Sequence, residues 1–114
     1  MNTYYPDKWV MLKITTRAHG VIYKVLASCY GGFAGSNSWQ LSSGTAGAFQ
    51  DPNTPEVILF PQESGSTYAC HKSVYGMSGY TAGILSTWQD QLKDSDNIIE
   101  ILDENFDIDL LNKI

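Results

Sequence analysis

Short apolar runs that alternate with polar residues, cut at intervals by turn residues, dominate residues 1–72 of this chain. In the first run Val10, Leu12 and Ile14 share one face, because successive side chains of a strand point to opposite sides. A second run, Val21–Tyr30, is rich in β-branched and aromatic residues. Turn residues lie between the two runs, so the pattern predicts a β-hairpin. A period of two repeated in this way restricts the chain to a β-rich fold.

Three further runs predict three further strands, at Trp39–Ser42, Glu56–Phe60 and Thr67–Lys72. Prolines in residues 51–55 separate the first of these from the second, since proline cannot donate a ladder hydrogen bond. Several short strands in so short a stretch indicate a small antiparallel barrel or a strongly curled sheet. The Sm-type barrel is one form of this architecture, although Sm-type chains usually begin with a helix.

The apolar period changes after Gly79, where Ile84, Leu85, Trp88 and Leu92 fall at helical spacing. This spacing predicts one amphipathic helix over Thr81–Lys93, with Thr81 as its N-cap.

The run Ile98–Leu102 fits either a sixth strand or another helix, and we favour the strand because the run is short, β-branched and bounded by turn residues. Leu110 and Leu111 indicate a short helical turn near the end of the chain. The sequence therefore predicts a mainly β (α+β) fold of five to six strands with one C-terminal helix, and a single domain over residues 1–114.

Composition and charge narrow the function classes. With 43% hydrophobic and 17% charged residues, the chain has the composition of a folded domain rather than of a disordered one. Residues 90–114 carry eight acids against Lys93 and Lys113, whereas residues 1–89 carry four acids against five scattered cations. Apolar residues are interleaved with the late acids, so this segment is expected to pack on the sheet and show its acids to water. Scattered cations disfavour tight, sequence-independent DNA binding.

No apolar run is long enough to cross a bilayer, and the first residues lack the pattern of a signal peptide. We therefore expect a cytoplasmic protein that does not bind membranes. In that compartment Cys29 and Cys70 are expected to be reduced, buried thiols rather than a disulfide.

Cys70 and His71 form the pair that most invites a chemical role, since cysteine and histidine together bind zinc or act as nucleophile and base. Neighbouring residues of a strand point to opposite faces, however, so the two side chains should not converge on one ion or substrate. We expect a buried Cys70 and an outward His71. No catalytic residue, no metal and no cofactor is predicted, which favours a protein that is not an enzyme.

Glycines crowd residues 31–35, which suggests a comparison with phosphate-binding loops. The Gly-Lys-Ser/Thr ending is missing, and a strand follows where a phosphate-binding loop requires a helix. A wide hairpin loop is the simpler interpretation.

Aromatic residues, among them seven tyrosines, are numerous for a chain of this length. Loops that mix tyrosine, serine, glycine and asparagine suit recognition, because tyrosine offers a large contact area with few rotatable bonds. The alternative is that many of these rings pack in the core with their hydroxyls at the surface. The candidate binding residues are Tyr30, Phe33, Trp39, Tyr75, Tyr80 and His71.

Parts of the chain resemble small proteins of tailed phages, especially marine ones, for which no activity is assigned. The segments that carry the resemblance are Tyr5-Pro6-Asp7-Lys8-Trp9-Val10, Tyr23-Lys24-Val25-Leu26-Ala27-Ser28-Cys29-Tyr30-Gly31-Gly32, Ser38-Trp39-Gln40-Leu41-Ser42-Ser43-Gly44 and Tyr68-Ala69-Cys70-His71. The resemblance covers most of the β-rich part and implies an origin in a phage, hence the cytoplasm of a host cell, but no mechanism.

Three functions follow, in order of preference. The first is a non-enzymatic accessory module that binds a protein partner or its own copies through aromatic and glycine-rich loops. The second, open but less favoured, is a single-stranded nucleic-acid binder in which aromatic rings stack on bases and lysines meet phosphates. Its candidate residues are Trp9, Trp39, Tyr30, Phe33, Lys13, Lys24 and Lys72. The third is a small-molecule or nucleotide-binding protein that uses the loop of residues 31–35 with His71 or His19.

Overall fold

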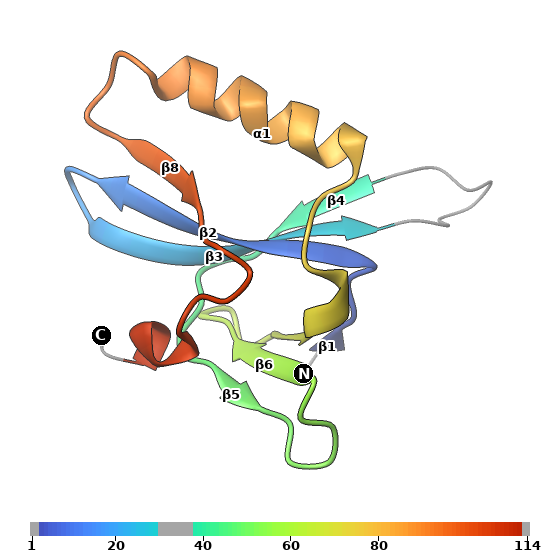
Figure 1. Cartoon of the computed structure of the whole chain (residues 1–114). Helices are drawn as coiled ribbons and strands as arrows, with labels where there is room; N and C mark the ends of the chain where they lie inside the picture. Colours follow the sequence, from blue (N-terminus) through green and yellow to red (C-terminus); the bar gives the residue numbers. More distant parts are fainter. Residues whose placement is uncertain (1–2, 30–37, 113–114) are drawn as a thin grey trace.

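The computed structural model describes residues 3–29 and 38–112, drawn in colour in Figure 1. These residues form eight strands, one α-helix and two 3-10 helices. The strands are β1 (Thr3–Tyr4), β2 (Lys8–Thr16), β3 (Gly20–Cys29), β4 (Ser38–Leu41), β5 (Phe49–Gln50), β6 (Val57–Pro61), β7 (Thr67–His71) and β8 (Ile98–Ile101). The helices are η2 (Lys72–Val74), α1 (Gly79–Leu92) and η3 (Ile108–Asn112).

The first sheet, which we call the long-strand sheet, has the order β4-β3-β2-β8. Its two central strands form an antiparallel hairpin, as predicted, with Val10 opposite Leu26 and Leu12 opposite Lys24. Gly20 closes the hairpin with a φ of 71°, a backbone angle that glycine adopts without steric cost. Strand β8 adds antiparallel to β2, which confirms the strand interpretation of that apolar run.

The second sheet, the short-strand sheet, has the order β1-β7-β6-β5. Strands β6 and β7 are antiparallel, with Ile58 opposite Cys70 and Phe60 opposite Tyr68, and β1 runs parallel to β7. Strands β1 and β5 are two residues long each and were not predicted, because so short a segment shows no period.

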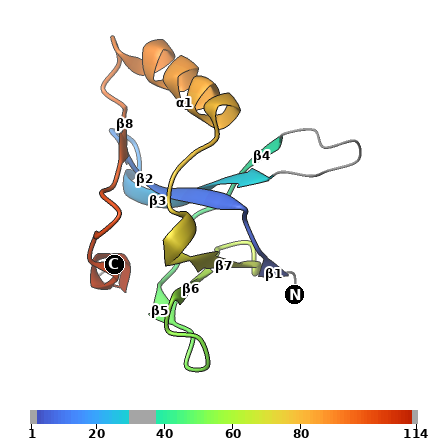
Figure 2. The same cartoon turned by 45° about the vertical axis from the view of Figure 1, so that its right-hand side comes forward.

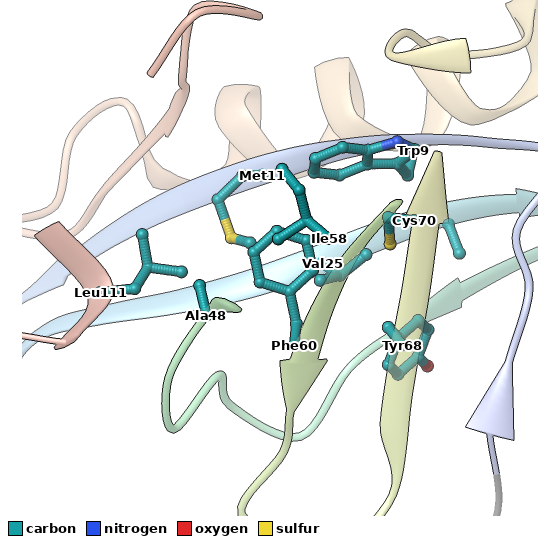
Figure 3. Packing of buried hydrophobic residues seen from close by; sticks show 10 residues of the cluster. Trp9, Met11, Val25, Ala48, Ile58, Phe60, Tyr68, Cys70 and Leu111 are labelled. Atoms are coloured by element: carbon teal, nitrogen blue, oxygen red, sulfur yellow. The ribbon is translucent and has the colours of Figure 1, made fainter. Parts of the chain in front are cut away.

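The elements stack in three layers, with α1 above the long-strand sheet and the short-strand sheet below it (Figures 1 and 2). Alternate residues of β2 therefore pack on opposite sides. Trp9 and Met11 meet Phe60 and other residues of the short-strand sheet (Figure 3), and Val10 and Leu12 pack with Leu85 of α1. Because both faces of the central hairpin are covered, the middle of β2 is apolar without a break.

The chain after α1 packs along the other elements, as the apolar residues among its acids predicted. It passes through β8 and descends beside the lower layer to η3, where Leu111 is fully buried. The side chain of Asn112 exchanges two hydrogen bonds with the backbone of Ala48, of 2.9 and 2.8 Å.

The mainly β fold with one α-helix is as predicted, but the predicted arrangement of the strands is not confirmed. The described strands form two sheets and no closed barrel, so the barrel and its Sm-type form are unconfirmed. The helix begins at Gly79 rather than Thr81, and its N-cap is Ser78, whose hydroxyl accepts from the Thr81 amide at 3.1 Å. Thr81 is fully buried and is not the cap.

Candidate binding surface

The most exposed tryptophan among the described residues is Trp39, on strand β4 at one edge of the long-strand sheet. Its side chain is 38% exposed and meets the ring of Trp88 of α1 edge-on, with the centroids 5.1 Å apart. Large amphipathic rings that are held in place and remain accessible are typical anchors of protein interfaces. We define the aromatic surface as Trp39, Trp88 and Tyr80.

Tyr80 lies in the first turn of α1, which a cluster of three buried hydroxyl groups holds over the long-strand sheet. Ser28 of β3 and Ser78 both donate to the Thr81 hydroxyl, each at 2.9 Å. Ser28 is also the residue opposite Trp39 in the β3–β4 pairing. The turn that carries Tyr80, itself 49% exposed, is thereby fixed above the strand that carries Trp39.

The outer edge of β4 presents backbone groups as well as rings. The amide of Ser42 donates to Val25 of β3 at 2.9 Å, and Gln40 lies opposite Ala27. Because the backbone groups of an antiparallel strand alternate between its two sides, those of Trp39 and Leu41 point away from β3. No described residue hydrogen-bonds to them, so this edge offers both donors and acceptors.

Tyr75, one of the predicted binding residues, is partly buried and packs against the core. Its hydroxyl accepts from the Met11 amide at 3.1 Å and donates to the Leu102 carbonyl at 2.6 Å. It therefore bridges β2 and the end of β8, and its ring stands edge-on to Trp9 at 4.7 Å. Burial is the main cause that raises the pKa of Tyr75, and the hydrogen bond from Met11 opposes this shift.

His71 points outward and Cys70 is fully buried, as the alternation in β7 predicted. The His71 Nδ1 accepts from the Ser73 amide at 3.2 Å, and its Nε2 lies 3.4 Å from a carboxylate oxygen of Glu56. His71 ends β7 of the short-strand sheet, which lies on the other side of the long-strand sheet from α1, so it does not belong to the aromatic surface. Burial raises the pKa of both Cys70 and Cys29, which are free thiols.

The remaining predicted residues divide between the described and the undescribed parts of the chain. Tyr30, Phe33 and the glycine-rich residues 31–35 lie outside the described residues. Trp9 is 1% exposed and its indole nitrogen donates to the His71 carbonyl at 2.8 Å, so it is not available to stack on a base.

The cations assigned to a nucleic-acid backbone do not form one track. In the β2–β3 register Lys13 lies opposite Tyr23, and Lys24 lies opposite Leu12. The two lysines therefore point to opposite faces of the long-strand sheet. Lys72 lies beyond the end of β7.

Open pockets elsewhere on the described surface are lined by polar groups, but none of them contains a nucleophile paired with a general base. One of about 490 Å³ is lined by Lys72 and by acids that include Glu104 and Asp109. Another of about 390 Å³ lies among His19, Tyr23 and Glu63. Within residues 3–29 and 38–112 no three His, Cys, Asp or Glu side chains gather as a metal-ligand set, and no helix is long and apolar enough to cross a membrane.

Sequence reasoning selected Trp39 and Tyr80 but assigned Trp88, whose ring meets that of Trp39, only to the apolar face of the helix. The available signal was the size of the Trp88 ring, since a ring of that size can reach past the apolar face it belongs to. Comparison with known proteins adds no further assignment, because no family model, no curated protein and no solved structure matches this chain.

Proposed function

We propose that this chain is a non-enzymatic binding module, a phage-type accessory protein of the host cytoplasm, that binds a protein partner through the aromatic surface and the outer edge of β4. The observation that carries the proposal is Trp39, which stays exposed although Trp88 holds its ring in place, on a strand whose outer edge pairs with no other strand of the described residues.

The chemistry of this surface suits a protein more than another class of ligand. Anchors of protein interfaces are enriched in tryptophan and tyrosine, and strand edges recognise extended peptide through main-chain hydrogen bonds. The four residues of β4, Ser38-Trp39-Gln40-Leu41, carry no charge, which favours contact with another polypeptide over contact with phosphate.

Photo-crosslinking from inside the surface tests the proposal. We replace Tyr80 with a benzophenone amino acid and irradiate cells that make the protein. A discrete crosslinked protein is expected, and Trp39→Ala in the same chain should reduce its yield about thirtyfold, the effect of losing an interface anchor of about 2 kcal/mol.

The matched control carries the same crosslinker at Phe49, an aromatic residue of equal exposure on strand β5 of the other sheet. It should give no such product. The proposal is wrong if the product forms equally from both positions, or if Trp39→Ala leaves the yield from Tyr80 unchanged.

A further inference from the structure

The two sheets end in strands of unequal capacity to pair with another strand. In the short-strand sheet the outer strands β1 and β5 are two residues each, too short to hold a further strand in register. In the long-strand sheet the outer strands β4 and β8 are four residues each. Only these two edges are long enough among the described residues, and they differ in how much of their backbone is free.

The β8 edge is partly occupied by the chain itself. The side-chain amide of Gln89 on α1 donates to the outward carbonyl of Ile99 at 3.1 Å. Directly before the strand, the backbone amide of Asn97 donates to the Ser95 hydroxyl at 3.1 Å. The strand also carries the charge of Glu100, and charged side chains on an edge oppose pairing with another chain. These features protect β8.

The β4 edge has none of these protections. The outward backbone groups of Trp39 and Leu41 have no partner among the described residues, and no side chain of the strand is charged. Natural proteins seldom leave an uncharged edge open, because such an edge is a template for pairing.

We infer that the partner of this edge is a second copy of the chain, whose β4 pairs antiparallel with β4 of the first about a twofold axis at Gln40. The inference rests on the proposed function, since it names the occupant of the same surface. Trp39 of each copy then lies opposite Leu41 of the other, and their outward backbone groups exchange two reciprocal pairs of hydrogen bonds.

This register follows from the faces of the strand. Residues directly opposite each other in a symmetric antiparallel pair must lie on the same face of the sheet, and Trp39 and Leu41 both face α1. Each Trp39 ring would then cover a Leu41 side chain of the other copy, a cross-strand aromatic–aliphatic pair. At the axis one uncharged Gln40 meets the other, whereas a β8 pair centred on Glu100 would oppose two carboxylates.

A charge exchange at the axis tests the inference by light scattering. The wild-type chain of 12.6 kDa should have twice that mass at high concentration. Gln40→Lys alone and Gln40→Glu alone should each weaken the dimer about fivefold or more, because like charges would lie directly opposite each other. An equal mixture of the two variants should recover the dimer. Gln50→Lys, the same exposed change on β5, is the matched control and should leave the mass unchanged.

A disulfide test fixes the register. Residues opposite each other at the axis form a non-hydrogen-bonded pair with Cα atoms about 4.5 Å apart, which lies within the range of a disulfide. In a Cys29→Ser background, Gln40→Cys should therefore form a covalent dimer under mild oxidation, and Gln50→Cys should not.

A wild-type chain that stays at 12.6 kDa up to millimolar concentration, with no covalent dimer from Gln40→Cys, would overturn the inference. So would a dimer that Gln40→Lys and Gln40→Glu leave unchanged. The two proposals can fail separately. If Tyr80 crosslinks to a different protein, and Trp39→Ala reduces that crosslink, the proposed function stands. The same result would exclude a second copy as the partner.

Discussion

At the scale of single residues, polar atoms placed at strand junctions stabilise the fold where the regular pairing stops. The Tyr75 hydroxyl is the clearest case. The Leu102 amide still donates to the Met11 carbonyl at 2.9 Å, but the reverse bond of that pair passes through the tyrosine. The last step of the β2–β8 ladder is therefore completed by a side chain that arrives from the segment before α1.

Tyr75→Phe should lower the free energy of unfolding by about 1–3 kcal/mol, because it leaves the Met11 amide and the Leu102 carbonyl without their partner. Urea denaturation measures the change as a shift of the midpoint with an unaltered slope. Tyr5→Phe is the control, since Tyr5 is 77% exposed, and it should have no measurable effect. If Tyr75→Phe left stability unchanged and abolished the crosslink from Tyr80, Tyr75 would be a binding residue after all.

At the scale of elements, the attachment of α1 to the long-strand sheet depends on hydroxyl groups as much as on apolar contacts. Leu85 supplies the buried apolar contact with β2 and β3, while Ser28, Ser78 and Thr81 fix the position of the first turn. Hydrogen bonds are more directional than apolar contacts, so the three hydroxyl groups add a geometric constraint on the first turn.

Thr81→Val keeps the shape of the side chain but removes the acceptor of two buried hydroxyls, so it should cost about 1–3 kcal/mol of unfolding free energy. Thr87→Val is the matched control on the same helix. Thr87 is exposed and its hydroxyl donates only to the Gly83 carbonyl, so the change should stay within about 0.5 kcal/mol. Equal urea midpoints for the two variants would show that the hydroxyl cluster does not anchor α1.

The elements that could be predicted from the sequence are those with a clear period. The β2–β3 hairpin and the body of α1 show it, and so does the buried Cys70 beside an outward His71 in β7. Strand β1 could not be predicted, because two residues are too few to show a period. The N-cap was misplaced by three residues because serine and threonine are both capping residues, and the backbone decides between them: Ser78 is extended, whereas Thr81 already lies in the helix.

The candidate surface was predictable only in part. Aromatic residues in β-rich chains suggest recognition, and this reasoning selected Trp39, Tyr80 and Tyr75 alike. The difference between Trp39 and Tyr75 is burial, which depends on the order of the strands, and that order is set by contacts between distant segments.

At the scale of the whole molecule, the core between the two sheets contains groups that ionise only in alkali. Burial raises the pKa of Tyr68 to about 12, with smaller contributions from Tyr4 and the two cysteines, and it raises the pKa of Cys70 as well. These groups stay neutral in the folded chain at a pH where they ionise in the unfolded chain.

The stability that these groups contribute is therefore complete below pH 9, near the ordinary pKa of a thiol, and is lost as the pH rises toward 12. The free energy of unfolding should fall progressively over this range, as measured by urea denaturation at a series of pH values. Cys70→Ala should make the decline shallower, whatever its effect at neutral pH. A constant unfolding free energy between pH 8 and pH 11 would contradict the burial of these groups.

The features of β8 also bear on how many neighbours the molecule can accept. The side-chain amide of Gln89 binds the Ile99 carbonyl and Glu100 adds a charge, so β8 is a poorer template for a further strand than β4. In the inferred pairing through β4, the strand that adds there leaves no second edge of equal quality, and the assembly ends as a pair. A chain with two equally open edges would instead extend from both sides.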